Sequence, residues 1–218
     1  TILLLPMSSL LEKLAITLVP DMSSKDKIAE LDERLLVTPS IALNRCFDLV
    51  SKMAELSVKS LKSSLNMLSN YDSAEAEEIR ASENKVDHYE DILGTYLVKL
   101  SSYQISDSDS TEVSKLLKAI GDFERISDHS VNVLESAEEL KDKELALSKQ
   151  ARSELDTLCS AVSEILTLTY NAFTNNDLSA ARNIEPLEQV VDGLKAKLRN
   201  NHIKRLKDGE CSIEAGFV

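Results

Sequence analysis

The chain has few of the residues that interrupt helices or build sheets. Its 218 residues include five Gly, four Pro, four Phe, five Tyr and no Trp. Sheets are enriched in aromatic and β-branched residues, and loop-rich folds need Gly and Pro at their turns. This composition therefore excludes a β-rich or loop-rich fold and is typical of long helices. At 43% hydrophobic residues, the chain has enough apolar side chains to bury a core.

Positive charge is also in short supply. The sequence has 25 Lys and Arg against 37 Asp and Glu, a formal net charge of −12. Nucleic-acid binding depends on neutralising phosphates with Lys and Arg, so we expect no nucleic-acid partner. Metal cations and basic protein surfaces are better suited to such a chain.

Catalytic motifs are missing as well. Cys46, Cys159 and Cys211 lie far apart and form no C-x-x-C, which favours a reducing compartment and plain buried thiols. The sequence contains neither a G-x-S-x-G nucleophile motif nor a Gly-rich phosphate loop. We therefore expect that the protein is not an enzyme.

The first 37 residues differ from the rest of the chain. Residues 1–20 are mostly apolar, but Pro6 and the Glu12-Lys13 pair interrupt a run that is too short to span a bilayer unaided. They lack the basic n-region of a signal peptide. We interpret them as the end of a membrane-proximal hydrophobic segment, with an ordinary amphipathic helix as the alternative. Residues 21–37 are charged, show no sustained period, and are predicted to be a linker.

Residues 38–142 carry the pattern of a three-helix bundle. Thr38 and Pro39 suit the cap and first position of a helix whose apolar residues recur every three or four positions to about residue 69. Asp72 with Glu75 has the spacing of a capping box and predicts a second helix to about residue 103. Asp109 with Glu112 repeats that spacing and predicts a third helix to about residue 140.

The pattern then starts again, because the chain is a tandem duplication. A shift of 105 positions carries Glu83 onto Glu188 and superimposes residues 61–100 on the second half without a gap. We predict helices at about 145–175 and 177–206, a left-handed stop at Gly209, and the first turns of a sixth helix at 212–218. The expected fold is all-α: two tandem three-helix bundles, with the second (143–218) ending within its last helix. Without a full last helix, the apolar stripes of the two preceding helices would border an open groove. We expect a neighbouring protomer or residues 1–19 to cover this groove, and hence a homo-oligomer.

Acidic side chains occur in pairs four residues apart, which places each pair on one helix face. On a helical wheel these pairs flank the apolar stripes, where carboxylates are poorly solvated and need a cation, a donor or a proton. A metal ion held by oxygens from facing helices would meet that need, and salt bridges to Lys or Arg of a neighbouring helix are the alternative. His88 and His129 each follow an acid of these pairs and are weaker candidates. The candidate metal ligands are Glu83, Asp87, Glu124, Asp128, Glu188 and Asp192.

Two strings in the first copy resemble a known family. Glu83-Asn84-Lys85-Val86-Asp87 and the stretch from Asp122 to His129 are similar to the E/D-x-x-x-D signatures of PhoU proteins, duplicated three-helix bundles that regulate phosphate uptake. Residues 4–6, 31–39 and 209–212 resemble the segment after the last membrane helix, and the PhoU-like tail, of bacterial sodium/phosphate cotransporter-related proteins.

This resemblance implies a cytoplasmic regulatory domain of a sodium-dependent phosphate transporter, at the inner membrane, that modulates phosphate uptake. Its implied partners are the transporter's own membrane domain and a signalling protein. The implied cofactor is an iron or zinc cluster, held in the first bundle by Glu83, Asp87, Glu124 and Asp128, with Glu188 and Asp192 as half of a second site. The alternatives are a free-standing PhoU-type regulator and, from another class, a carboxylate-bridged metalloenzyme.

Overall fold

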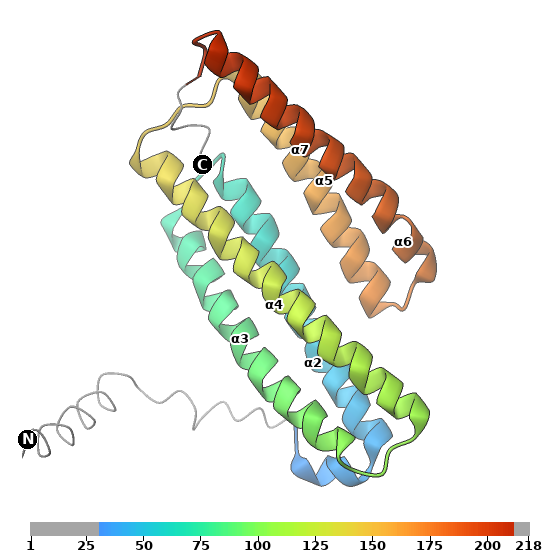
Figure 1. Cartoon of the computed structure of the whole chain (residues 1–218). Coiled ribbons are helices and arrows are strands. Elements are labelled where there is room, and N and C mark those ends of the chain that lie inside the picture. Colours follow the sequence, from blue (N-terminus) through green and yellow to red (C-terminus); the bar gives the residue numbers. More distant parts are fainter. Residues whose placement is uncertain (1–30, 212–218) are drawn as a thin grey trace, which may run out of the picture.

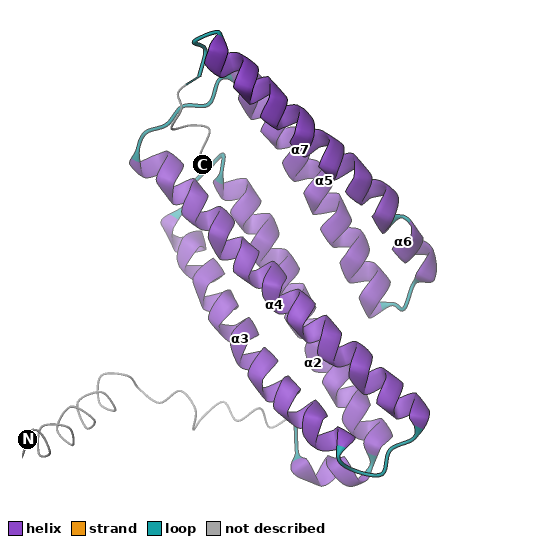
Figure 2. Cartoon of the chain, viewed as in Figure 1, coloured by secondary structure: helices purple, strands orange, loops and turns teal. Residues whose placement is uncertain are grey.

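A computed structural model describes residues 31–211, and every regular element in that range is helical (Figure 2). A short 3-10 helix, η2 (Glu33–Val37), precedes five long helices and one short one. The all-α prediction is therefore confirmed for the described residues. No helix in this part of the chain is both long and apolar enough to cross a membrane. The α-helices are α2 (Pro39–Met67), α3 (Ser73–Ser101), α4 (Asp107–Asp142), α5 (Lys149–Thr174), α6 (Leu178–Arg182) and α7 (Ile184–Lys207).

Helices α2, α3 and α4 form the predicted first bundle (Figure 1). Helix α2 supplies most of the core, because its apolar residues at three- and four-residue spacing fall on one stripe that the other two helices cover. Their buried partners on α3 and α4 follow the same spacing. Fully buried core residues include Leu49, Val50 and Met53 of α2, Leu93 and Leu97 of α3, and Leu116 and Ile120 of α4.

Local capping explains where most of these helices begin. Asp72 caps α3, as predicted, and accepts hydrogen bonds from the backbone N–H groups of Ala74 and Glu75. The prediction for α4 was wrong by three residues, because Ser106 is the cap and forms its reciprocal capping box with Asp109. Ser148 caps α5, so that helix begins four residues later than predicted.

The single helix predicted for 177–206 is broken at Asn183 into α6 and α7. Pro186 accounts for the break, since Pro has no backbone N–H to donate to the carbonyl four residues earlier in a helix interior, whereas the N–H groups of a first turn have no such acceptor. Pro186 occupies the first turn of α7, and Ala81 stands at the equivalent position of the continuous helix α3. The predicted stop at Gly209 is confirmed: its φ is +73°, and Glu210 N–H donates to Arg205 O at 2.9 Å.

Part of the predicted linker packs on the first bundle. Leu36 of η2 is 1% exposed, and the Tyr96 hydroxyl of α3 donates to the backbone oxygen of Asp32 at 3.0 Å. Lys99 forms an ion pair with Glu33 at 2.5 Å. Residues 31–37 are therefore held against α3, while the predictions for residues 1–30 and 212–218 concern segments outside the described residues.

Helices α5 and α7 pair as a hairpin that rests on the first bundle through α5 (Figure 1). Phe173 of α5 packs against the rings of Phe47 and Phe123, with centroids 5.5 and 5.1 Å away. Leu166 is buried against Val58 and Leu61 of α2. The two long helices of the second repeat are thus attached to the first bundle by an apolar contact.

The α5–α7 hairpin has charged residues at positions where the first bundle has buried leucines. The repeat register aligns Leu49 and Leu100, both buried, with Glu154 and Arg205. Arg205 Nη1 lies 2.9 Å from Glu154 Oε2, with the two side chains 6% and 18% exposed. Asn201 also donates to Glu154, so a buried polar network replaces leucines.

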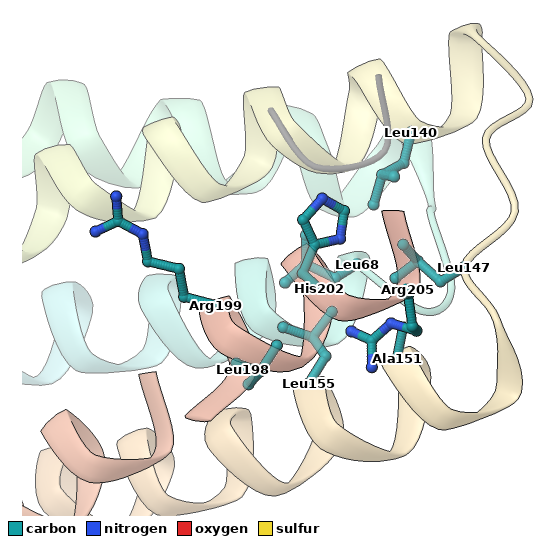
Figure 3. A pocket seen from close by; sticks show the side chains of 9 residues that line it. All are labelled: Leu68, Leu140, Leu147, Ala151, Leu155, Leu198, Arg199, His202 and Arg205. Carbon is teal, nitrogen blue, oxygen red and sulfur yellow. The ribbon is translucent and has the colours of Figure 1, made fainter. Parts of the chain in front are cut away.

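This network borders a cavity of about 410 Å³ between the hairpin and the ends of α2 and α4 (Figure 3). Figure 3 shows His202 and Arg205 among leucine side chains, with Arg199 pointing away from them. Hydrogen bonds from Arg205, Gln150 and Asn201 lower the pKa of Glu154 against the opposing effect of desolvation.

We predict that both residues of the buried ion pair can be replaced together, but that removing one of them alone destabilises the protein. Arg205→Leu should lower the free energy of unfolding by about 3 kcal/mol, because it leaves the Glu154 carboxylate buried without its partner. Glu154→Leu/Arg205→Leu, which restores the residues of the first copy, should stay within about 1 kcal/mol of the parent or exceed it. Urea denaturation measures both; a double variant as unstable as the single one would contradict the prediction.

Candidate metal centre

Two facing helices bring three carboxylates together. Glu83 and Asp87 lie one turn apart on α3, and Asp128 reaches them from α4. One oxygen of each lies within 4.8 Å of the others. Because metal–oxygen bonds measure about 2.0–2.6 Å, a single cation fits between oxygens so spaced. The structure thus brings together three of the six predicted ligands.

The fourth predicted ligand of the first copy, Glu124, lies beside this group. It is half-buried on α4, one turn before Asp128, and its carboxyl both repels and hydrogen-bonds that of Asp128. Its oxygen is not one of the three that converge. Glu124 is therefore placed to support Asp128 or to extend the cluster.

The carboxylates destabilise each other's charge. Partial burial, followed by repulsion from Asp87 and Asp128, raises the pKa of Glu83. Partial burial and the nearby charges of Asp128 and Asp91 raise the pKa of Asp87. Burial and Asp128 raise the pKa of Glu124 in the same way. At one place, therefore, burial first and neighbouring acids second raise three pKa values, which shows that the negative charge of these carboxylates is poorly stabilised.

Nearby basic residues do not supply that charge. Within residues 31–211, no ion pair joins Lys or Arg to Glu83, Asp87, Glu124 or Asp128. Arg80 acts to lower the pKa of Glu83, but burial and the neighbouring acids outweigh it, and the Arg80 guanidinium pairs with Glu138 at 2.7 Å. For these four acids the salt-bridge alternative is therefore not realised in the described part of the chain, and the all-oxygen donor set fits a hard or borderline cation.

Two further acids that the sequence analysis did not single out belong to the same surface. Asp91 raises the pKa of Asp87, and Glu90 raises that of Glu124. Asp91 lies one turn after Asp87 on α3, so continuing the four-residue spacing along the helix would have found it. The acidic surface is thus longer than the paired motifs alone suggested.

The predicted ligands of the second copy are not gathered in this way. Glu188 and Asp192 are exposed on α7, and Asp192 pairs with Lys195 at 3.1 Å. No third acid, His or Cys joins them within the described range. Both histidine candidates, His88 and His129, are exposed and lie outside the three-carboxylate group.

The raised pKa values predict a pH dependence for the metal-free protein. The unfolded carboxyls titrate near 3.8 for Asp and 4.5 for Glu, and the folded ones at higher pH. Between those values the folded state binds more protons, so this cluster's contribution to stability rises as the pH falls through that window.

Glu83→Gln/Asp87→Asn/Glu124→Gln should therefore stabilise the metal-free protein at pH 7, by about 0.5 kcal/mol from the removed like-charge pairs. The gain should shrink toward pH 4. Denaturant unfolding at both pH values, after treatment with chelator, checks this. A gain that is equal at the two pH values, or a loss at pH 7, would show that the carboxylates do not repel each other as described.

Comparisons with known proteins match the part of the chain that contains the carboxylate group to a known family. Residues 50–137 match the model of the PhoU domain family, which covers α3 and most of α2 and α4. The phosphate-specific transport system accessory protein PhoU homolog 1 of Thermotoga maritima is 23% identical over 175 residues, covering 78% of this chain and 72% of that protein. No solved structure matches the chain.

PhoU proteins are regulatory and non-enzymatic, which confirms the expectation that this protein is not an enzyme. The matched residues include Glu83, Asp87, Glu124 and Asp128, so the carboxylate group lies inside the family domain. Residues 50–137 therefore match the PhoU domain family, and the chain is similar to a PhoU accessory protein.

Proposed function

We propose that the protein is a PhoU-type regulator of phosphate uptake whose first bundle holds a metal ion. The single observation that carries the proposal is the convergence of Glu83, Asp87 and Asp128 inside the matched PhoU domain. The relative from Thermotoga maritima, named for phosphate-specific transport, supports the link to phosphate.

The role of the metal would be structural. An ion bound by two oxygens of α3 and one of α4 supplies the positive charge that the seam between these helices lacks, and it fixes the spacing of the helices. Glu124, through its contact with Asp128, would orient that ligand or bind a second ion. Iron and zinc, the metals implied by the family resemblance, both accept carboxylate oxygen. Glu188 and Asp192 remain a prediction for a second site.

The finer proposal is a tail of a sodium-dependent phosphate transporter. The resemblance of residues 31–39 to such proteins supports it, together with the packing of residues 31–37 on α3, which gives anything upstream a fixed point of attachment. In that arrangement the transporter's membrane domain is the partner in cis, at the cytoplasmic face of the inner membrane. A signalling protein and a second copy of the chain are further proposed partners. The family match and the accessory-protein relative favour the free-standing regulator over this reading.

Elemental analysis tests the metal proposal. Untagged protein purified without chelator should contain iron, zinc or manganese at a near-stoichiometric level, and Glu83→Gln/Asp87→Asn/Asp128→Asn should lose it. The control is Glu135→Ala/Glu139→Ala, an acid pair at the same spacing on α4 but outside the cluster, which should keep the metal. Metal in all three proteins would place the ligands elsewhere; metal in none would leave a metal-free scaffold.

Phosphate uptake tests the regulatory proposal separately. In a bacterial strain that lacks its own PhoU, expressing the chain should change the rate of labelled phosphate uptake at limiting phosphate. The metal-site variant should lose most of that effect, and the Glu135→Ala/Glu139→Ala control should keep it. An uptake rate that is the same with and without the chain would refute the regulatory proposal even if the metal site is real.

A further inference from the structure

Positive charge is distributed unevenly over the two halves of the molecule. Residues 38–142 hold 20 acidic and 11 basic side chains, whereas residues 143–211 hold ten of each. Within the second half, no acid occurs between Asp192 and Asp208, a stretch of α7 that carries six Lys or Arg. A protein of net charge −12 thus has one continuous cationic segment among its described residues.

Five of these six cations are exposed and form a broad arc, the basic face of α7, that covers about 200° of the helix circumference at ~100° per residue. Leu194, Leu198 and Arg205 point toward the hairpin core, and the remaining cations lie on the solvent side. The face extends for about 18 Å at the helical rise of 1.5 Å per residue. Its members are Lys195, Lys197, Arg199, Lys204 and Lys207.

These cations are mostly not neutralised within the described chain. Lys195 pairs with Asp192 at 3.1 Å, an exposed contact of the kind that contributes little. No ion pair of the described residues involves Lys197, Arg199, Lys204 or Lys207. With acids in excess on the rest of the surface, this face is available to an external anionic partner.

The duplication shows that the fold does not require this charge. The repeat register aligns Lys195, Lys197, Arg199 and Lys207 with Glu90, Ile92, Gly94 and Ser102 of the first copy, and only Lys204 meets another cation, Lys99. Cations near a helix C-terminus interact favourably with its dipole, but the first copy forms the same helix with one of them in place of five. The helix itself therefore does not account for the charge in the second copy.

We propose that the basic face of α7 is a docking surface for the anionic headgroups of a lipid bilayer. The face is a convex array of four Lys and one Arg, of which only Arg199 borders the cavity beside the hairpin, and this suits a diffuse anionic surface better than bidentate recognition of one carboxylate. Ile203 is 43% exposed in the middle of the array, where an apolar side chain enters the headgroup region.

The placement of α7 in the molecule permits this contact. Helix α7 packs on α5, and α5 in turn packs on α2, so α7 lies on the side of the molecule away from α3 (Figure 1). The acidic surface of α3 and α4 would then point away from the lipid and would not oppose binding. The inference rests on the charge and exposure of α7, and it does not depend on the proposed function.

Vesicle flotation with the full 218-residue chain tests the proposal. Vesicles with about 30% phosphatidylglycerol in phosphatidylcholine should bind the protein at about 50 mM salt and release it at about 300 mM salt. Vesicles of pure phosphatidylcholine should not bind it. Each Lys or Arg replaced by Gln should weaken binding about 5-fold, and replacing all five should abolish it. Ile203→Ser should weaken it as well, without changing its salt dependence.

A matched variant separates this face from net charge. Replacing Arg45, Lys59, Lys115, Lys118 and Arg125 with Gln removes five exposed cations from the first bundle, and this variant should bind vesicles like the parent. Equal loss in both variants, or no binding of the parent at low salt, would overturn the proposal. The proposal would also be overturned if the parent did not bind vesicles but formed a salt-sensitive dimer that the α7 variant cannot form. The basic face would then join two copies of the chain.

Discussion

The burial of one long apolar stripe on α2 is the constraint on which the rest of the structure depends. A single helix cannot cover that stripe, so α3 and α4 must lie on it side by side and contact each other along their edges. Each buried Leu or Met contributes about 1.5–3 kcal/mol, whereas an exposed like-charge pair costs a few tenths. Hydrophobic burial therefore dictates the arrangement, and it brings the acidic edges of α3 and α4 together despite their repulsion.

The candidate metal site follows from that arrangement. Glu83, Asp87 and Asp128 do not have to be drawn together by a metal, because the packing of Val86 and its apolar neighbours already holds their helices in place. What the packing leaves behind is a concentration of negative charge with raised pKa values and no Lys or Arg partner among the described residues. A cation bound there would neutralise this negative charge. Its binding would therefore be favourable and would depend on the spacing of the two helices.

The sequence was a good guide wherever local chemistry decides the outcome. The Asp72 cap, the Gly209 stop and the acid pairs within α3 and within α4 follow from spacing over one or two turns. Prediction was weaker where distant contacts choose among local options. Residues 106–110 offer several caps, and Ser106 is selected because Ile105, just before it, packs into the core. The Glu154–Arg205 pair joins residues 51 positions apart, and no local pattern announces it. The break before Pro186 also has a local cause, because Pro is tolerated in the first turn of a helix but not in its interior, and the single predicted helix did not include this break.

The two copies of the repeat differ in the residues that they place at equivalent positions. The first copy keeps leucines at its core positions and acids on the seam between α3 and α4; the second has a buried ion pair and a cationic face on α7. Anomalous X-ray scattering from crystals of protein purified without chelator is the most direct measurement of the central claim. The account predicts an anomalous peak bonded to oxygens of Glu83, Asp87 and Asp128 at about 2.0–2.6 Å. A site filled by water or by a Lys or Arg side chain, with no such peak, would contradict it.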